Sequence, residues 1–215
     1  MNIAIVTGAS SGMGKEFVKQ LSGYVKVDEV WVIARREQAL KELQALCPYS
    51  IRTLAFDLGK EESFVSISAL LEKEQPDVKL LVNAAGFGKF GRFEKIPLAD
   101  ELGMIDLNCK ALVAMTRIVL PYMHRGSHIL QLDSLSAFQP VPFITTYGAT
   151  KSFVLSYSRA MNAELKGTGI RMMAMNPGWV KTEFFGRAME TDNADVQYFN
   201  HLYEADAVVA TGLKH

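Results

Sequence analysis

A tyrosine and a lysine four positions apart, with a serine upstream, are the residues of this chain best suited to acid–base chemistry. Tyr147 and Lys151 stand in the sequence Tyr-Gly-Ala-Thr-Lys, and Ser134 precedes them on the chain. Residues four positions apart on a helix share a face, so we expect the phenol to lie beside the ammonium group. A free tyrosine has a pKa of about 10, and a nearby cation can lower it by roughly 1–3 units. Such a phenol could exchange a proton with a substrate oxygen near neutral pH.

That spacing alone carries little weight, because Tyr-x-x-x-Lys occurs by chance in many helices. Two nearby residues also offer alternatives. Ser136 is a second serine close to the pair, although its spacing from the tyrosine fits less well than that of Ser134. Tyr157 lies on the same predicted helix but has no lysine four residues later, so we expect it to serve packing. The interpretation therefore depends on the rest of the chain.

A glycine-rich turn directly after the first predicted strand is the second chemical feature. Residues 7–14 have the pattern T-G-x-x-x-G-x-G. Glycine lacks the Cβ that would keep a pyrophosphate away from the backbone, and the following helix N-terminus offers unpaired N–H groups to phosphates. A purely structural turn is the alternative, but its place after the first strand of a strand–helix series favours nucleotide binding. The residues expected to contact the nucleotide are Gly8, Ser10, Ser11, Gly12, Met13 and Gly14.

Two arginines after the second predicted strand bear on the choice of nucleotide. In NAD-binding domains an acidic residue at this place holds the ribose hydroxyls. This chain has Ala34 there, followed by Arg35 and Arg36. Guanidinium groups suit a 2′-phosphate, because their paired N–H donors match its oxygens. The alternative is that both arginines are solvated surface residues; the pattern predicts NADP(H) rather than NAD(H).

Short apolar runs alternate with amphipathic stretches, and these elements must position the residues above. Continuous apolar runs are typical of parallel strands that are buried on both faces. Alternating strands and helices imply an α/β fold with a doubly wound parallel sheet. The predicted strands are residues 2–6, 29–34, 51–56, 78–82, 128–132 and 170–175. The predicted helices are about 12–22, 37–46, 61–74, 100–120, 147–166 and 203–213.

Composition and charge argue against several classes of function. The 215 residues, 49% of them hydrophobic, suit a single domain, 1–215, with a sizeable core. The 23 basic and 23 acidic residues balance, which argues against nucleic acid or an anionic membrane as a partner. Cys47, Cys109 and the four histidines show no metal-ligand spacing, so we expect no metal. Neither a signal peptide nor a membrane-spanning run is apparent, so we expect a cytoplasmic protein.

Taken together, the motifs resemble the short-chain dehydrogenases/reductases, a family with a single Rossmann-type domain. The resemblance covers residues 7–182 and rests on five separated motifs that occur in the family's order and spacing. It implies a Rossmann-type doubly wound parallel sheet with strand order 3-2-1-4-5-6. Beyond the glycine turn and the arginines, it implies cofactor contacts at Asp57, Leu58, Asn83, Ala84, Ala85, Gly86, Tyr147, Lys151, Pro177, Gly178, Val180 and Thr182.

The resemblance also implies a mechanism, which is hydride transfer between nicotinamide and a carbonyl or alcohol carbon. Tyr147 would exchange a proton with the substrate oxygen, and Lys151 would lower the tyrosine pKa and bind the nicotinamide ribose. Ser134 would donate a hydrogen bond to the substrate oxygen. Asn108, in the fourth helix, would hold a water that links Lys151 to solvent, although a helix asparagine can also simply be exposed.

Loops after the fourth, fifth and sixth strands are expected to form the substrate end. They carry many aromatic residues, which favours a small apolar carbonyl or alcohol substrate. Residues 183–203 resemble the family's substrate lid. The family usually continues into a seventh strand, and this chain stops at Gly212-Leu213-Lys214-His215, so we expect that edge strand to be absent. An apolar stripe on the fourth helix leads us to expect a homodimer.

Two other functions remain open at this stage. Epimerases and dehydratases of related folds also use Tyr-x-x-x-Lys, but they usually carry a G-x-x-G-x-x-G turn and a larger substrate domain. A non-catalytic NADP-binding regulator or scaffold is the second alternative. Such proteins commonly lose the tyrosine or the lysine, and Tyr147 and Lys151 are both present. The sequence therefore favours an NADP(H)-dependent oxidoreductase.

Overall fold

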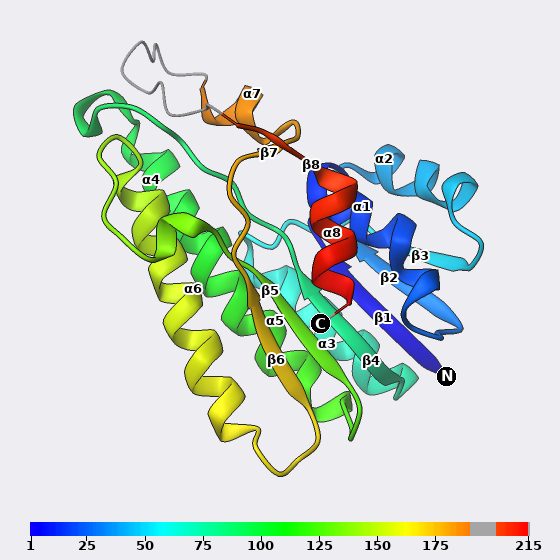
Figure 1. Cartoon of the computed structure of the whole chain (residues 1–215). Helices are drawn as coiled ribbons and strands as arrows, with labels where there is room; N and C mark the ends of the chain where they lie inside the picture. Colours follow the sequence, from blue (N-terminus) through cyan, green and yellow to red (C-terminus); the bar gives the residue numbers. More distant parts are fainter. Residues whose placement is uncertain (190–200, 215) are drawn as a thin grey trace.

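Six parallel strands form the central sheet of the computed structural model, which describes residues 1–189 and 201–214 (Figure 1). Their order is β3-β2-β1-β4-β5-β6, so the predicted order is confirmed. The strand ends differ from the predicted ranges by at most two residues. The strands are β1 Asn2–Thr7, β2 Glu29–Ile33, β3 Ser50–Leu54, β4 Asp77–Asn83, β5 His128–Leu132 and β6 Arg171–Met175.

Helices cover both faces of this sheet, as a doubly wound fold requires. One face packs against α1, α2 and α8, and the other against α3, α5 and α6 (Figure 1). The helices are α1 Gly12–Gln20, α2 Glu37–Lys41, α3 Glu61–Glu74, α4 Leu98–Ile105, α5 Ala111–Val119, α6 Thr145–Glu164, α7 Phe184–Ala188 and α8 Ala205–Leu213. In the part of the chain that the structure describes, none of them is long and apolar enough to cross a membrane.

The alternation of side chains along each strand divides the core into two layers. Ile3 and Ile5 of β1 pack on the face covered by α3, α5 and α6, whereas Ala4 and Val6 pack on the opposite face. All four are fully buried. Because both faces are covered, polar residues are absent from the middle of β1, and the strand reads as one continuous apolar run.

The long helix predicted over residues 100–120 is interrupted. α4 ends at Ile105, Asp106–Lys110 form a π-helical turn, and α5 begins at Ala111. A π turn widens the helix without stopping it, so the amphipathic pattern continues across it and does not reveal it. After α5 the helix closes in a 3-10 turn, Leu120–Tyr122, at the proline where we expected it to stop.

After β6 the chain crosses the carboxyl edge of the main sheet and forms a small second sheet. β7, Val180–Lys181, pairs in parallel with β8, Tyr203–Glu204. The last helix therefore begins at Ala205 rather than at 203, because Tyr203 donates its backbone N–H to the carbonyl oxygen of Trp179 at 2.8 Å. Of the predicted lid 183–203, residues 190–200 lie outside the described residues.

Candidate active site

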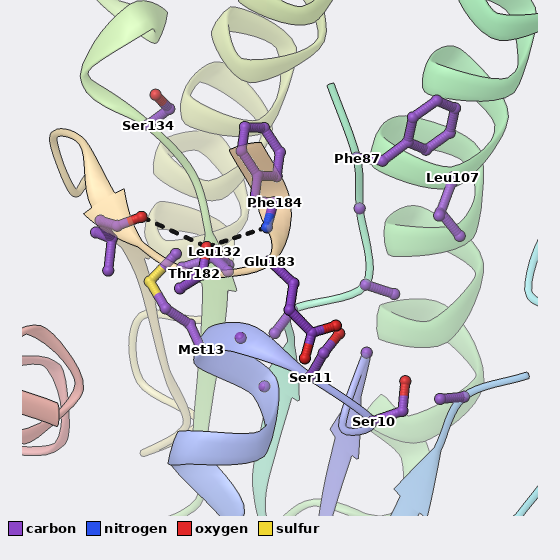
Figure 2. Close-up of a pocket in the computed structure, with 18 of the residues that line it drawn as sticks. Ser10, Ser11, Met13, Phe87, Leu107, Leu132, Ser134, Thr182, Glu183 and Phe184 are labelled. Carbon is purple, nitrogen blue, oxygen red and sulfur yellow. Dashed lines mark hydrogen bonds between the residues drawn. The ribbon is translucent and has the colours of Figure 1, made fainter. Parts of the chain in front are cut away.

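A groove of about 490 Å³ runs along the carboxyl ends of the strands (Figure 2). Ligands of open α/β sheets bind at this edge. Every residue predicted to contact the cofactor lines the groove except Asn83. Of the predicted catalytic residues, Ser134, Tyr147 and Lys151 line it and Asn108 does not. Within the described ranges, no group of three or more His, Cys, Asp or Glu side chains could hold a metal ion.

Close backbone approach explains the glycine-rich turn at the base of the groove. Gly8 has a φ of +68°, and a Cβ on it would lie 2.7 Å from the carbonyl oxygen of Ala84. A Cβ on Gly14 would overlap the carbonyl oxygen of Gly8. The hydroxyl of Thr7 accepts the backbone N–H groups of Ala84 and Ala85, each at 3.1 Å. The turn is thus fixed against the segment after β4 and leaves its backbone open to a phosphate group.

Arg36 lies at the mouth of the groove and spans it. Its Nε donates to Ser10 Oγ at 3.3 Å, and its Nη2 donates to the Ser10 carbonyl oxygen at 3.2 Å. Its Nη1 and Nη2 both donate to Glu183 Oε2, at 3.3 and 3.4 Å. The guanidinium group therefore already binds one anionic oxygen beside the glycine turn, at the place where a 2′-phosphate was predicted.

Tyr147, Lys151 and Ser134 come together in one wall of the groove. The first two turns of α6 carry Tyr147 and Lys151 on one face, as predicted, and both are buried. The Lys151 ammonium lies 5.6 Å from the centre of the Tyr147 ring and donates a hydrogen bond of 2.7 Å to the Leu132 carbonyl oxygen. Ser134 follows β5, and its Oγ accepts the Ser136 N–H at 3.2 Å. The set has the arrangement needed for proton exchange with a bound oxygen.

Burial sets the proton affinity of both α6 residues. It raises the pKa of Tyr147 above its usual value, and a hydrogen bond with Ser134 opposes this shift. Burial lowers the pKa of Lys151 to about 8, and the neighbouring Asp133 opposes that shift. Burial is thus the main cause of the shift at Tyr147, and the lowering of the tyrosine pKa by Lys151 stays a prediction.

Asp133 is a buried carboxyl group next to the predicted catalytic residues, and the sequence did not point to it. It directly precedes Ser134 and is 2% exposed. Among the described residues, neither carboxylate oxygen has a well-formed hydrogen bond. Burial raises the pKa of Asp133 to about 7, while Lys151, the Ser134 N–H and Arg159 act in the opposite direction. A charged residue at the end of an apolar strand was a signal that could have identified it.

The two asparagines outside the groove fix the segment after β4. Asn108, in the π turn, donates to the carbonyl oxygen of Phe87 at 2.9 Å and accepts the N–H of Phe87 at 3.0 Å. It also donates to Thr150 Oγ1 at 3.0 Å. A cofactor contact had been predicted for Asn83, but its side chain donates to Gln131 Oε1 and Thr116 Oγ1 inside the core and does not line the groove. Both side chains support the site from behind.

An aromatic cluster closes the far end of the groove over Tyr147. The ring centres of Phe184 and Phe90 lie 5.5 and 5.7 Å from that of Tyr147. The cluster consists of Phe87, Phe90, Phe143, Tyr147, Trp179, Phe184 and Phe185. Two other aromatic residues of the predicted substrate loops, Phe93 and Phe138, are largely exposed and lie outside it.

The family model that describes the short chain dehydrogenases matches residues 2–193. The chain belongs to the short-chain dehydrogenase family. The match includes the glycine turn, Ser134, Tyr147 and Lys151, so the resemblance drawn from the motifs is confirmed. The enzyme class, an oxidoreductase of this family, follows from the same match.

Similar proteins fall into the same class. The NADP-dependent 3-hydroxy acid dehydrogenase of Schizosaccharomyces pombe is 34% identical over 84% of this chain and 72% of its own length. The solved structure of a short-chain dehydrogenase from Sphingobium yanoikuyae in complex with NADPH has a TM-score of 0.85 at 26% identity, and covers 100% of this chain and 84% of that one. The closed form of a serine dehydrogenase complexed with NADP+ has a TM-score of 0.81 at 30% identity, with coverages of 98% and 87%.

Two charged residues of the groove in this dehydrogenase, Asp133 and Glu183, were not predicted from the sequence, because they belong to none of the family's motifs. Asp133 is adjacent to Ser134, and Glu183 is adjacent to Thr182, yet neither belongs to a recognisable spacing. Both line the groove. For Glu183, its position next to a predicted site residue was the available signal, and it gives no direction for the side chain.

Proposed function

We propose that this dehydrogenase catalyses NADP(H)-dependent interconversion of a carbonyl and an alcohol group. The observation that carries the proposal is the meeting of Ser134, Tyr147 and Lys151 in one wall of the groove that begins at the glycine turn. Bound NADP(H) supplies or accepts the hydride. The protein positions the substrate oxygen and handles its proton.

The proton chemistry belongs to Tyr147. Its hydroxyl gives a proton to the substrate oxygen during reduction and takes one from it during oxidation. The raised pKa of Tyr147 keeps the phenol protonated near neutral pH, which suits the reductive direction. Ser134 donates a hydrogen bond to the same oxygen and stabilises the charge that develops there. Lys151 adds positive charge beside the phenol.

The residues of the groove fit a nucleotide with a 2′-phosphate. Gly8 and Gly14 leave a backbone cradle that a Cβ would fill, as binding of a pyrophosphate requires. Arg36 already holds an anionic oxygen at the mouth of the groove, and Arg35 lines the same wall. The NADP named for relatives of this chain supports the same choice. NADP(H), and not NAD(H), is the proposed coenzyme.

The substrate end favours an apolar molecule. Phe87, Phe90, Ile144 and Phe184 surround the hydroxyl-bearing side chain of Tyr147. Apolar walls with a few placed polar groups are typical of small-molecule sites. A small carbonyl or alcohol compound with an apolar body is therefore the proposed substrate class.

A substrate panel tests this function. Oxidation of NADPH and NADH is followed with aldehydes, ketones and diketones, for the wild type and for Tyr147→Phe. Loss of the proton donor is expected to lower kcat by a factor of about 10²–10⁴. Tyr157→Phe is the matched control, because this second tyrosine of α6 stacks on Phe153 instead of lining the groove. Equal activity of Tyr147→Phe and wild type would contradict the mechanism. Tight NADPH binding without turnover on any substrate would favour the regulator or scaffold.

We also propose that the protein forms a homodimer. α4 and α6 lie side by side (Figure 1), and both expose large apolar residues. Leu98, Leu102 and Ile105 of α4 are 68%, 52% and 47% exposed, and Phe153 of α6 is 43% exposed. Contiguous apolar surface of this kind marks interaction sites in soluble proteins.

A further inference from the structure

One segment crosses the groove from the glycine turn to the catalytic tyrosine. We call residues 182–188 the crossing segment. At its start, Thr182 lies over Gly12 of the glycine turn. A Cβ on Gly12 would lie 3.5 Å from the Thr182 Cβ, which is an ordinary van der Waals contact. Glu183 then pairs with Arg36, and Phe184 packs on Tyr147. Figure 2 shows Glu183 and Phe184 pointing in opposite directions, one toward the nucleotide end and the other toward the catalytic end.

This arrangement covers the group that must react. Tyr147 is only 7% exposed, and Phe184 and Phe90 pack against its ring. A general acid must come within hydrogen-bond reach, about 2.6–3.2 Å, of the substrate oxygen. Phe184 would have to leave the Tyr147 ring for a substrate to pack in its place.

The Glu183–Arg36 ion pair holds the other end of the crossing segment, and coenzyme binding can break it. Glu183 Oε2 receives two hydrogen bonds from the Arg36 guanidinium, which also holds Ser10. A carboxylate at this position occupies the donors that a 2′-phosphate needs. A phosphate dianion and the carboxylate also repel each other, so they compete for the same Arg36 N–H donors, Nη1 and Nη2.

We propose that Glu183 competes with the 2′-phosphate of NADP(H) for Arg36, and that the exchange releases the crossing segment from Tyr147. The inference rests on the proposed function, since it takes Arg36 as the 2′-phosphate ligand. Coenzyme binding at one end of the groove thereby opens the substrate end. NAD(H) has no 2′-phosphate, so it leaves the Glu183–Arg36 ion pair in place and does not open the substrate end. Selectivity for NADP(H) over NAD(H) therefore comes from release of the crossing segment as well as from binding affinity.

The ion pair is exposed, with side chains 54% and 69% accessible, so its effect on affinity is modest. Exposed pairs of this kind change binding by a factor of about two to five. We therefore expect Glu183→Gln to bind 2′,5′-ADP about two- to five-fold more tightly than wild type. Binding of 5′-AMP, which lacks the 2′-phosphate, is expected to be unchanged.

Isothermal titration with these two nucleotides tests the competition without any turnover. Glu204→Gln is the matched control, because Glu204 pairs with Lys181 at the same distance, 3.3 Å, and with similar exposure, but outside the groove. That variant should bind both nucleotides as wild type does. In an Arg36→Gln background, Glu183→Gln should no longer tighten 2′,5′-ADP binding, since the guanidinium group for which the two anions compete is gone.

Trp179 fluorescence reports the release. Its ring centre lies 5.9 Å from that of Phe90 and 5.8 Å from that of Phe185, which belongs to the crossing segment. We expect 2′,5′-ADP, but not 5′-AMP, to change the emission of the wild type, and Trp179→Phe to abolish the change. Ligand-free Glu183→Gln should emit between ligand-free wild type and wild type saturated with 2′,5′-ADP, because loss of the exposed ion pair changes the equilibrium by only about two- to five-fold.

The outcomes separate the two levels of the proposal. If Arg36→Gln leaves 2′,5′-ADP binding unchanged, the assignment of Arg36 to the 2′-phosphate fails, and the competition fails with it. If Arg36→Gln weakens binding while Glu183→Gln changes neither affinity nor emission, the assignment stands and the competition is refuted. Equal tightening of 2′,5′-ADP and 5′-AMP by Glu183→Gln also refutes it, because the effect would then be unspecific.

Discussion

The charge of the groove wall beside Tyr147 depends on a buried carboxyl group, Asp133, as well as on Lys151. The two groups attract each other, and burial shifts the pKa of each toward the neutral form, to about 7 for Asp133 and about 8 for Lys151. Burial thus weakens the charged form of both groups. The protonation of this pair determines how much positive charge faces Tyr147.

Asp133→Asn should change how the stability of the protein depends on pH. The pKa of Asp133 is raised in the folded state, so the folded protein binds more protons than the unfolded chain between about pH 4 and pH 7. The Asp133 contribution to the free energy of unfolding thus falls as pH rises through this window. We expect the variant to gain on the order of 2–4 kcal/mol relative to wild type between pH 4 and pH 8. Urea denaturation at pH 4, 5, 6, 7 and 8 measures it.

A matched control distinguishes burial from the simple loss of a charge. Asp106→Asn removes a half-exposed carboxylate that pairs with Lys110 on the surface. Its stability relative to wild type should stay within about 0.5 kcal/mol over the same pH values. A difference between Asp133→Asn and wild type that does not grow with pH would show that Asp133 is not buried as a charge.

Sequence reasoning succeeded at those residues whose side-chain direction is set by a regular element. Tyr147 and Lys151 share a face because both lie on α6, and the helix period fixes that relation. Glu183 follows no such period, because it lies between β7 and α7 and its direction is set by Arg36, 147 positions earlier in the chain. A contact of this kind depends on the fold, so local patterns do not predict it.

At the scale of elements, the π turn joins three parts of the site. It places Asn108 between the segment after β4 and the first turns of α6, where its amide group binds both backbone groups of Phe87 and the hydroxyl of Thr150. π turns are frequent at functional sites because they redirect one side chain without ending the helix. Here the Asn108 side chain fixes the backbone of Phe87, which lines the groove.

Removal of that amide should destabilise the fold. Asn108→Ala removes three buried hydrogen bonds, two to Phe87 and one to Thr150, and each such bond contributes about 0.5–1.5 kcal/mol. We expect a loss of about 2–5 kcal/mol in the free energy of unfolding, measured by urea denaturation. Thr150→Val removes just one of the three bonds to Asn108 and should cost roughly 1 kcal/mol. Equal, small losses in both variants would contradict this role.

The elements themselves were largely predictable, and the exceptions have physical reasons. The six strands are continuous apolar runs because both faces are covered, which is a strong local signal. The break in the helix over 100–120 gives no such signal, since the apolar face continues from α4 into α5. β8 is two residues long and forms because Tyr203 donates its backbone N–H to the Trp179 carbonyl oxygen. This strand depends on a tertiary contact, so local sequence patterns do not predict it.

At the scale of the whole molecule, the groove and the exposed apolar surface occupy different places. The groove lies at the carboxyl ends of the strands, whereas α4 and α6 lie side by side in the helix layer (Figure 1), and their residues Leu98, Leu102, Ile105 and Phe153 are exposed. A second copy could therefore pack on these helices and leave the mouth of the groove open. Met104 of α4 and Val154 of α6 are fully buried in the same protomer, so each helix has one face for the core and another for a partner.

The homodimer leads to a prediction on mass. Wild type should run at the mass of two chains in size-exclusion chromatography with light scattering, because association removes the exposed Leu98, Leu102 and Phe153 from water. Leu102→Glu places a charge in the interface and should shift the mass to one chain. Val65→Glu is the control: this residue of α3 is 70% exposed but lies away from α4 and α6, so the variant should keep the wild-type mass. Wild type at the mass of one chain would refute the dimer, and a dimeric Leu102→Glu would place the interface elsewhere on the surface.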